Sequence, residues 1–105
     1  MLEQLEKMLA AGRDSAMLRL TLGNGYLKEG RPEEAVRHLR EAVRQQPDYS
    51  AAWKALGRAL GEVGEVEEAL CAYDDGIRIA REKGDLQAAK EMEVFRRRLE
   101  KRRSE

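Results

Sequence analysis

Hydrophobic residues recur along this chain at the three- and four-residue steps that place side chains on one side of a helix. The pattern is clear in residues 53–60 and again in residues 86–99. The recurring apolar residues are Trp53, Leu56 and Leu60 in the first stretch, and Leu86, Ala89, Met92, Phe95 and Leu99 in the second. Both stretches are therefore predicted to be amphipathic helices whose apolar stripe faces a core.

The middle of the chain matches itself at an offset of 34 residues. One copy spans Ala16 to Tyr49 and the next spans Ser50 to Lys83. The matched pairs include Leu22-Gly23 with Leu56-Gly57, Gly30 with Gly64, Glu33-Glu34-Ala35 with Glu67-Glu68-Ala69, and Leu39 with Tyr73. Because small and large residues recur in one order, the repeat indicates that the same helix packing occurs twice.

Two of the matched glycines, Gly23 and Gly57, lie in the middle of predicted helices. Glycine costs about 1 kcal/mol relative to alanine at such a position. Its presence indicates a packing reason, namely a neighbouring helix that comes too close for a side chain. We expect the partners in these close approaches to be Ala35 and Ala69, which lie on the following helices.

Glycine and proline also mark the connections between the predicted helices. Gly30-Arg31-Pro32 and Gly64-Glu65 are predicted to be tight links, with the proline in the first turn of a helix. Pro47-Asp48 is predicted to end one helix, and either Asp48 or Ser50 is expected to cap the next. Each repeat is therefore predicted to be a helical hairpin.

These positions resemble the tetratricopeptide repeat, whose pattern is Trp-x2-Leu-Gly-x2-Tyr, then Ala-x3-Phe, then Pro, over 34 residues. The first copy fills the pattern with Leu22, Gly23, Tyr26, Ala35, Leu39, Ala42 and Pro47, and the second with Trp53, Leu56, Gly57, Ala69 and Tyr73. The departures are Arg19 for Trp, Leu60 for Tyr, Gly76 for Ala and Arg81 for Pro. Because no proline stops the last repeat helix, we expect it to run on toward Gly84.

The resemblance implies an all-α, right-handed array of helical hairpins, similar to short bacterial proteins of this family with two full repeats. We expect a single domain over residues 1–105 with about six helices, because both ends of such an array need atypical closing elements. Its expected parts are an N-terminal capping helix and link (1–14), repeat 1 (16–49), repeat 2 (50–83), and a C-terminal capping helix with a basic tail (84–105). At the same 34-residue offset, Leu5 and Met8 match Leu39 and Ala42. At the other end, Gly84-Asp85 is expected to end one helix and cap the next.

Composition limits the classes of function. Charged residues make up 38% of the chain, against about 25% in an average domain. The formal net charge is zero, so no global field attracts nucleic acid or anionic lipid. Apolar runs are too short to cross a bilayer, which predicts no membrane span and makes a cytoplasmic protein the default expectation.

The sequence carries no phosphate-binding glycine loop, nucleophile elbow or metal-ligand spacing. It therefore indicates no enzyme, no cofactor and no metal. The only histidine, His38, is expected to be a solvated surface residue. Cys71 is expected to be partly exposed and inert, and Asp74-Asp75 is expected to be solvated.

In tetratricopeptide domains the first helices of successive repeats line a concave face that receives a peptide or a helix of a partner protein. The resemblance places eight residues on that face: Met17, Leu20, Asn24, Leu27, Lys28, Lys54, Arg58 and Glu62. Lys54 and Arg58, one turn apart, offer two cations to an acidic partner. The resemblance thus implies an adaptor, co-chaperone or assembly factor, and it leaves room for a weak homodimer or for a subunit of a larger array.

The C-terminus offers an alternative, because residues 96–105 carry a net charge of +4 and residues 1–95 a net charge of −4. The basic residues are Arg96, Arg97, Arg98, Lys101, Arg102 and Arg103. Such a stretch can bind RNA or an anionic surface. Cations at a helix C-terminus also complement the helix dipole, however, and no aromatic residue follows Phe95 to stack on a base. These features disfavour nucleic acid as the partner.

Overall fold

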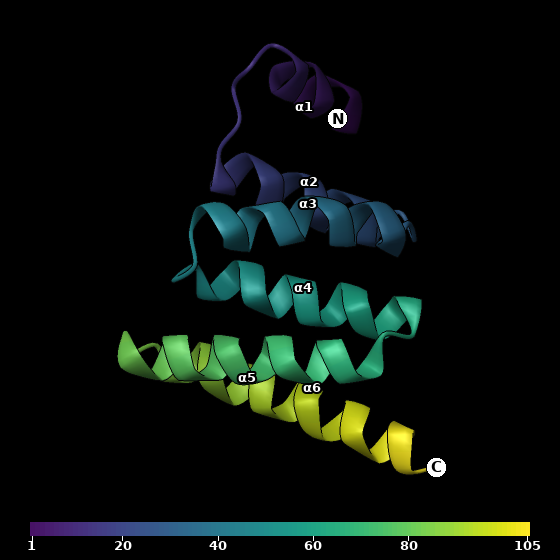
Figure 1. The fold of residues 1–105 in the computed structure, drawn as a ribbon, viewed down its shortest axis with the longest axis vertical. Coiled ribbons are helices and arrows are strands. Elements are labelled where there is room, and N and C mark those ends of the chain that lie inside the picture. The colour runs from purple at the N-terminus through teal and green to yellow at the C-terminus, as the bar shows by residue number, and fades with distance from the viewer.

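The computed structural model describes residues 1–105, and the chain folds into six α-helices with no strand (Figure 1). This confirms the all-α class and the expected number of helices. The helices are α1 (Leu2–Ala10), α2 (Ala16–Lys28), α3 (Pro32–Gln45), α4 (Ser50–Val63), α5 (Val66–Glu82) and α6 (Leu86–Ser104). None of them is both long enough and apolar enough to span a membrane.

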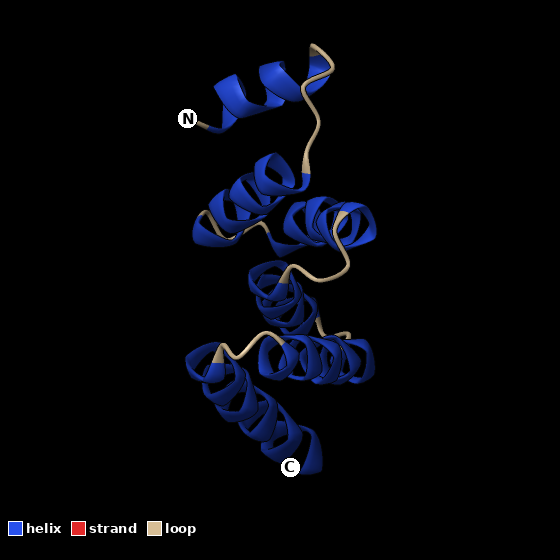
Figure 2. Cartoon of the chain, turned by 90° about the vertical axis from the view of Figure 1, so that its left-hand side faces the viewer, coloured by secondary structure: helices blue, strands red, loops and turns tan.

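The helices stack along the long axis of a molecule that measures 42 × 31 × 18 Å. Helices α2, α4 and α6 form one layer, and α3 and α5 form the other (Figure 2). Helix α4 lies close to both α2 and α6, whereas the backbones of α3 and α5 lie farther apart and are joined by the ion pair of Arg40 with Glu68. The stack therefore curves around the layer of α2, α4 and α6, which we call the concave face.

The two glycines singled out in the sequence do sit at close helix approaches, but the predicted partners were wrong. A Cβ atom on Gly23 would lie 2.5 Å from the side chain of Leu39, and one on Gly57 would lie 2.6 Å from the ring of Tyr73. Leu39 and Tyr73 lie one helical turn beyond the expected alanines. A large side chain fills the space that each glycine leaves open, which explains why the two features recur together at the same offset.

Helix ends follow the sequence signals at three places. Pro32 lies in the first turn of α3, Asp85 caps α6 by accepting a hydrogen bond from the backbone N–H of Ala88, and α5 continues to Glu82. The expected cap of α4 was wrong. The residue before that helix is Tyr49, which makes no side-chain cap. Asp48 is instead held by the ammonium of Lys83, 2.8 Å from its backbone carbonyl oxygen.

The two terminal helices close the stack unequally. Helix α6 buries Ala89, Met92 and Leu99 against the rest of the chain and partly buries Phe95, as its apolar stripe predicted. The prediction was wrong for Leu86, which lies in the first turn of the helix and is 61% exposed. Helix α1 buries no residue and packs loosely on α2. Leu5 and Met8 therefore do not reproduce the fully buried positions of the matching repeat residues, and the N-terminal half of the expectation was wrong in this respect.

Candidate functional site

Two adjoining hollows open on the concave face. The first, which we call the α2/α4 hollow, has a volume of about 490 Å³ and is also lined by Met1. The second, the α4/α6 hollow, has a volume of about 240 Å³. Arg58 and Glu62 of α4 line both hollows and separate them.

The structure brings together five of the eight residues that the sequence placed on this face. The α2/α4 hollow is lined by Asn24, Leu27, Lys28, Arg58 and Glu62. Asn24, Lys28, Arg58 and Glu62 are exposed, and Leu27 is half-buried at the base. The hollow thus combines a small apolar surface with polar groups of both signs, although the binding role of these residues stays a prediction.

The other three predicted residues lie outside that hollow. Met17 is 69% exposed near the start of α2, and Leu20 packs partly against the core. Lys54 donates a hydrogen bond to the carboxylate of Glu91 on α6, at 3.0 Å. This ion pair lowers the pKa of the Glu91 carboxyl and leaves Arg58 as the cation of the expected pair without a carboxylate partner.

Arg58 turns toward α6 as well, since its guanidinium lies 5.7 Å from the centre of the Phe95 ring. Contacts of this kind between a guanidinium and an aromatic face are attractive. The C-terminal helix is therefore a wall of the concave face. This placement was not predictable from the sequence, because the helix lacks the Leu-Gly signature of a repeat and its contacts join residues that are distant along the chain.

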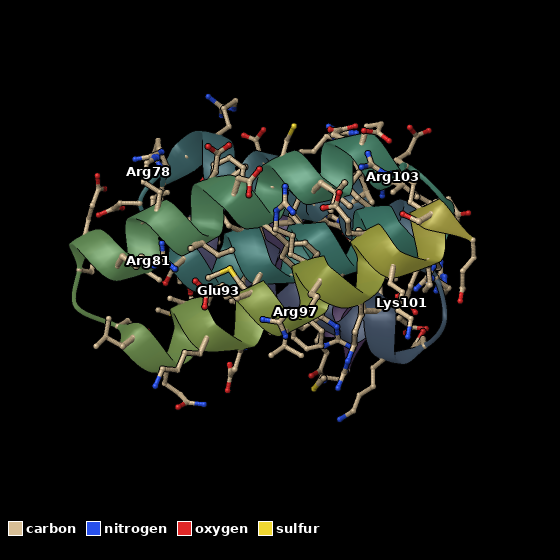
Figure 3. All side chains as sticks on the ribbon, turned by 90° about the horizontal axis from the view of Figure 1, so that it is seen from below. Arg78, Arg81, Glu93, Arg97, Lys101 and Arg103 are labelled. Carbon is tan, nitrogen blue, oxygen red and sulfur yellow. The ribbon has the colours of Figure 1, made fainter.

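The basic residues of α6 do not form one surface. Arg96 pairs with Asp74 of α5 at 2.7 Å and with Glu100 at 2.6 Å. Arg103 pairs with Glu67 of α5 at 2.7 Å. Arg98 and Arg102 line the α4/α6 hollow. Arg97 and Lys101 make no ion pair and follow one another along α6 at the open end of the stack (Figure 3).

The prediction that His38 is a solvated residue was wrong, because its side chain is 2% exposed. Its ring stacks on that of Tyr26 at a centroid distance of 5.5 Å, and its Nδ1 atom lies 3.2 Å from a guanidinium nitrogen of Arg19. Burial lowers the pKa of His38. A signal was present in the sequence: the matching residue of repeat 2 is Ala72, a small apolar residue that is itself buried.

The buried side chain of His38 also lies next to the N-terminal helix α1. Its Nε2 atom faces the Glu6 carboxylate of α1 at 3.4 Å, and the hydroxyl of Tyr26 donates a hydrogen bond to the same carboxylate. The Tyr26 bond is the largest reason why the pKa of Glu6 is lowered. The Glu6 carboxylate therefore ties α1 to α2 through Tyr26 and lies beside His38 of α3, whose Nε2 atom is buried without a hydrogen-bond partner.

The remaining candidates for chemistry are on the surface. Cys71 is exposed, in agreement with the sequence prediction. Asp74 is exposed and engaged by Arg96, and Asp75 lies 3.8 Å from Arg78. The chain contains no group of three or more His, Cys, Asp or Glu side chains arranged to hold a metal ion.

Comparison with known proteins identifies a family and several relatives that share this architecture. A family model described as tetratricopeptide repeat matches residues 20–85. A Pseudomonas aeruginosa protein named as TPR repeat-containing is 49% identical over 104 residues, which is 99% of each chain. The solution structure of a Bordetella parapertussis protein matches 97% of this chain and 89% of its own, with 42% identity and a TM-score of 0.83. The crystal structure of a tetratricopeptide repeat domain protein from Salinibacter ruber matches 83% of this chain and 97% of its own, with 25% identity and a TM-score of 0.76.

Proposed function

Because this chain belongs to the tetratricopeptide repeat family, we propose that it is a protein-binding module whose concave face receives a segment of a partner protein. Tetratricopeptide repeats generally mediate interactions between proteins and are generally non-catalytic scaffolds. The role of an adaptor, co-chaperone or assembly factor fits this activity. The fold alone hosts many partners, so the proposal depends on the face itself.

The observation that supports the proposal is the pair of hollows that meet at Arg58 and Glu62. The hollows lie side by side across α2, α4 and α6, with Arg58 and Glu62 of α4 between them. An extended segment laid across it would meet the apolar side of Leu27, the amide of Asn24 and then the guanidinium of Arg58. Such a site provides both an anchor and polar groups that fix orientation, as recognition sites for peptides require.

Binding of RNA or an anionic surface through the C-terminal helix is the second candidate. It is less well supported because Arg96 and Arg103 are already neutralised by carboxylates of α5 and α6. The cations that remain are divided between the α4/α6 hollow and the open end of the stack. A weak homodimer and the division of residues 1–105 into two repeats with capping helices also remain proposals.

Site-specific photo-cross-linking tests the proposed binding face. A photoreactive amino acid replaces Asn24 on the concave face in one variant and Arg37, an exposed residue of α3 in the other layer, in a matched control. After irradiation in native lysate, we expect cross-links from position 24 that an excess of unmodified protein suppresses, and few from position 37. Equal labelling from both positions, or labelling that the competitor does not suppress, would contradict a specific concave site.

A further inference from the structure

We propose that the α4/α6 hollow is an anion site that holds side-chain carboxylates of an acidic segment of the partner protein. This inference rests on the proposed function and specifies the chemistry of the partner. The site joins a residue from the expected groove, Arg58, to two residues of the arginine-rich helix, Arg98 and Arg102. These two features lie far apart in the sequence and converge only in the folded chain.

The first support is uncompensated charge. Three guanidinium groups line this hollow, and none of them makes an ion pair, whereas Arg96 and Arg103 on the same helix are both paired. The only acidic residue that lines it is Glu62, so the lining carries a net charge of +2. Guanidinium groups that converge on a small space bind carboxylates well, because each can donate two parallel hydrogen bonds.

The second support is a hydroxyl group on the wall of the hollow that has no partner within the protein. Tyr73 of α5 is 3% exposed and forms part of the wall of the hollow, and its hydroxyl makes no hydrogen bond within the protein. Burial raises the pKa of Tyr73 to about 12, so the hydroxyl keeps its proton at neutral pH and remains a donor. A hydroxyl that keeps its proton on the wall of this hollow can donate a hydrogen bond to a bound carboxylate oxygen.

The shape of the hollow also comes from specific residues. Gly57 and Gly61 of α4 present no side chain, and the rings of Tyr73 and Phe95 with the side chain of Leu99 form the base. A volume of about 240 Å³ accommodates one or two acidic side chains. The α2/α4 hollow lies on the other side of Arg58, so the same segment would next place an apolar side chain beside Leu27.

An acidic protein segment fits these features better than a nucleic acid does. A single strand binds through stacked bases and a track of cations along its backbone. Here the face of Phe95 is covered by the guanidinium of Arg58, and ion pairs interrupt the row of cations at Arg96 and Arg103. The cations that remain are divided between this hollow and Arg97 and Lys101 at the open end of the stack, so they form no continuous track.

Fluorescence anisotropy with a defined probe tests the site on the full chain. The probe is a labelled peptide in which glutamates flank one leucine, and the reference probe has glutamine in place of every glutamate. At about 50 mM salt, where surface electrostatics is only partly screened, we expect saturable binding of the glutamate peptide alone. Loss of two charge-assisted hydrogen bonds in an Arg98→Gln, Arg102→Gln variant should weaken binding by about tenfold or more.

Two matched variants separate the site from general attraction by charge. An Arg97→Gln, Lys101→Gln variant removes the same charge from the same helix outside the hollow, and should change the affinity by less than about twofold. Tyr73→Phe removes only the hydroxyl and should weaken binding by several-fold while the circular dichroism spectrum stays unchanged. Equal losses in the two double variants, no binding of the glutamate peptide, or tighter binding of a labelled single-stranded RNA would each overturn the inference.

Photo-cross-linking in the same double variants distinguishes failure of the anion site from failure of the proposed function. If position 24 gives specific cross-links that persist in the Arg98→Gln, Arg102→Gln variant, the concave face binds a partner but the anion site is wrong. If position 24 gives none, the proposed function itself fails. If the cross-links disappear in that variant and remain in the Arg97→Gln, Lys101→Gln control, both proposals are supported.

Discussion

Two glycines one turn apart in α4, Gly57 and Gly61, are predicted to respond differently to the same substitution by alanine. Alanine is favoured over glycine in a helix interior by about 1 kcal/mol, and this gain applies at both positions. At Gly61 a new Cβ atom would lie 3.7 Å from Leu99, which is an ordinary van der Waals contact. Gly61→Ala should therefore stabilise the protein by up to about 1 kcal/mol, which raises the melting temperature by roughly 4–8 °C in a domain of this size.

At Gly57 the same methyl group would lie 2.6 Å from Cε1 of Tyr73 and 2.8 Å from two more of its ring carbons. The Tyr73 residue is 3% exposed, so most of its ring is held by packing against its neighbours. Adding a methyl group to a packed core costs about 1–3 kcal/mol, which offsets or exceeds the gain in helix propensity. Gly57→Ala is therefore expected to leave stability unchanged or to lower it by up to about 2 kcal/mol.

Urea denaturation followed by far-ultraviolet circular dichroism measures this difference, provided that the slope of the unfolding free energy against urea is the same in both variants. We expect the midpoint to rise for Gly61→Ala and to stay level or fall for Gly57→Ala. An equal rise in both variants would show that the Tyr73 ring is not packed against α4 as described. A fall in both would show that the base of the α4/α6 hollow is tighter than the contact with Leu99 indicates.

Three further predictions concern other parts of the chain. Burial lowers the pKa of His38, the only histidine, below the unfolded value of 6.5. The unfolded state then binds more protons just below that pH, so the melting temperature should fall as the pH decreases from 7 toward 5, and His38→Gln should flatten this dependence. In hydrogen-exchange mass spectrometry, amides of α1 should exchange faster than those of α4 and α5, because α1 buries no residue; equal protection would contradict the loose packing. Cys71 should react fully with a thiol reagent without denaturant, because it is exposed, and slow reaction that urea accelerates would contradict that placement.

Features that depend on short spacing were predictable from the sequence. Apolar residues three and four positions apart show which side of a helix is buried, and this holds for α6 from Ala89 to Leu99. The Gly84-Asp85 pair correctly predicted the end of α5 and the cap of α6. The offset of 34 residues aligned Leu39 with Tyr73, and both fill the space beside a helical glycine. Because these signals either span a few residues or recur at one fixed interval, they can be recognised in a single sequence.

Features that depend on the placement of separate helices were not predictable in this way. The burial of His38 depends on how α1 and α2 cover α3, and the ion pair between Lys54 and Glu91 joins residues 37 positions apart. The sequence assigned Arg58 to a groove and Arg98 to a separate basic stretch, and only the packing of α6 beside α4 brings them to one hollow. One sequence was sufficient to predict the helices and the interval at which they repeat, because helix periodicity is local. The tertiary structure decided which charges are paired and which remain free, because that depends on side chains meeting across helices that no spacing rule connects.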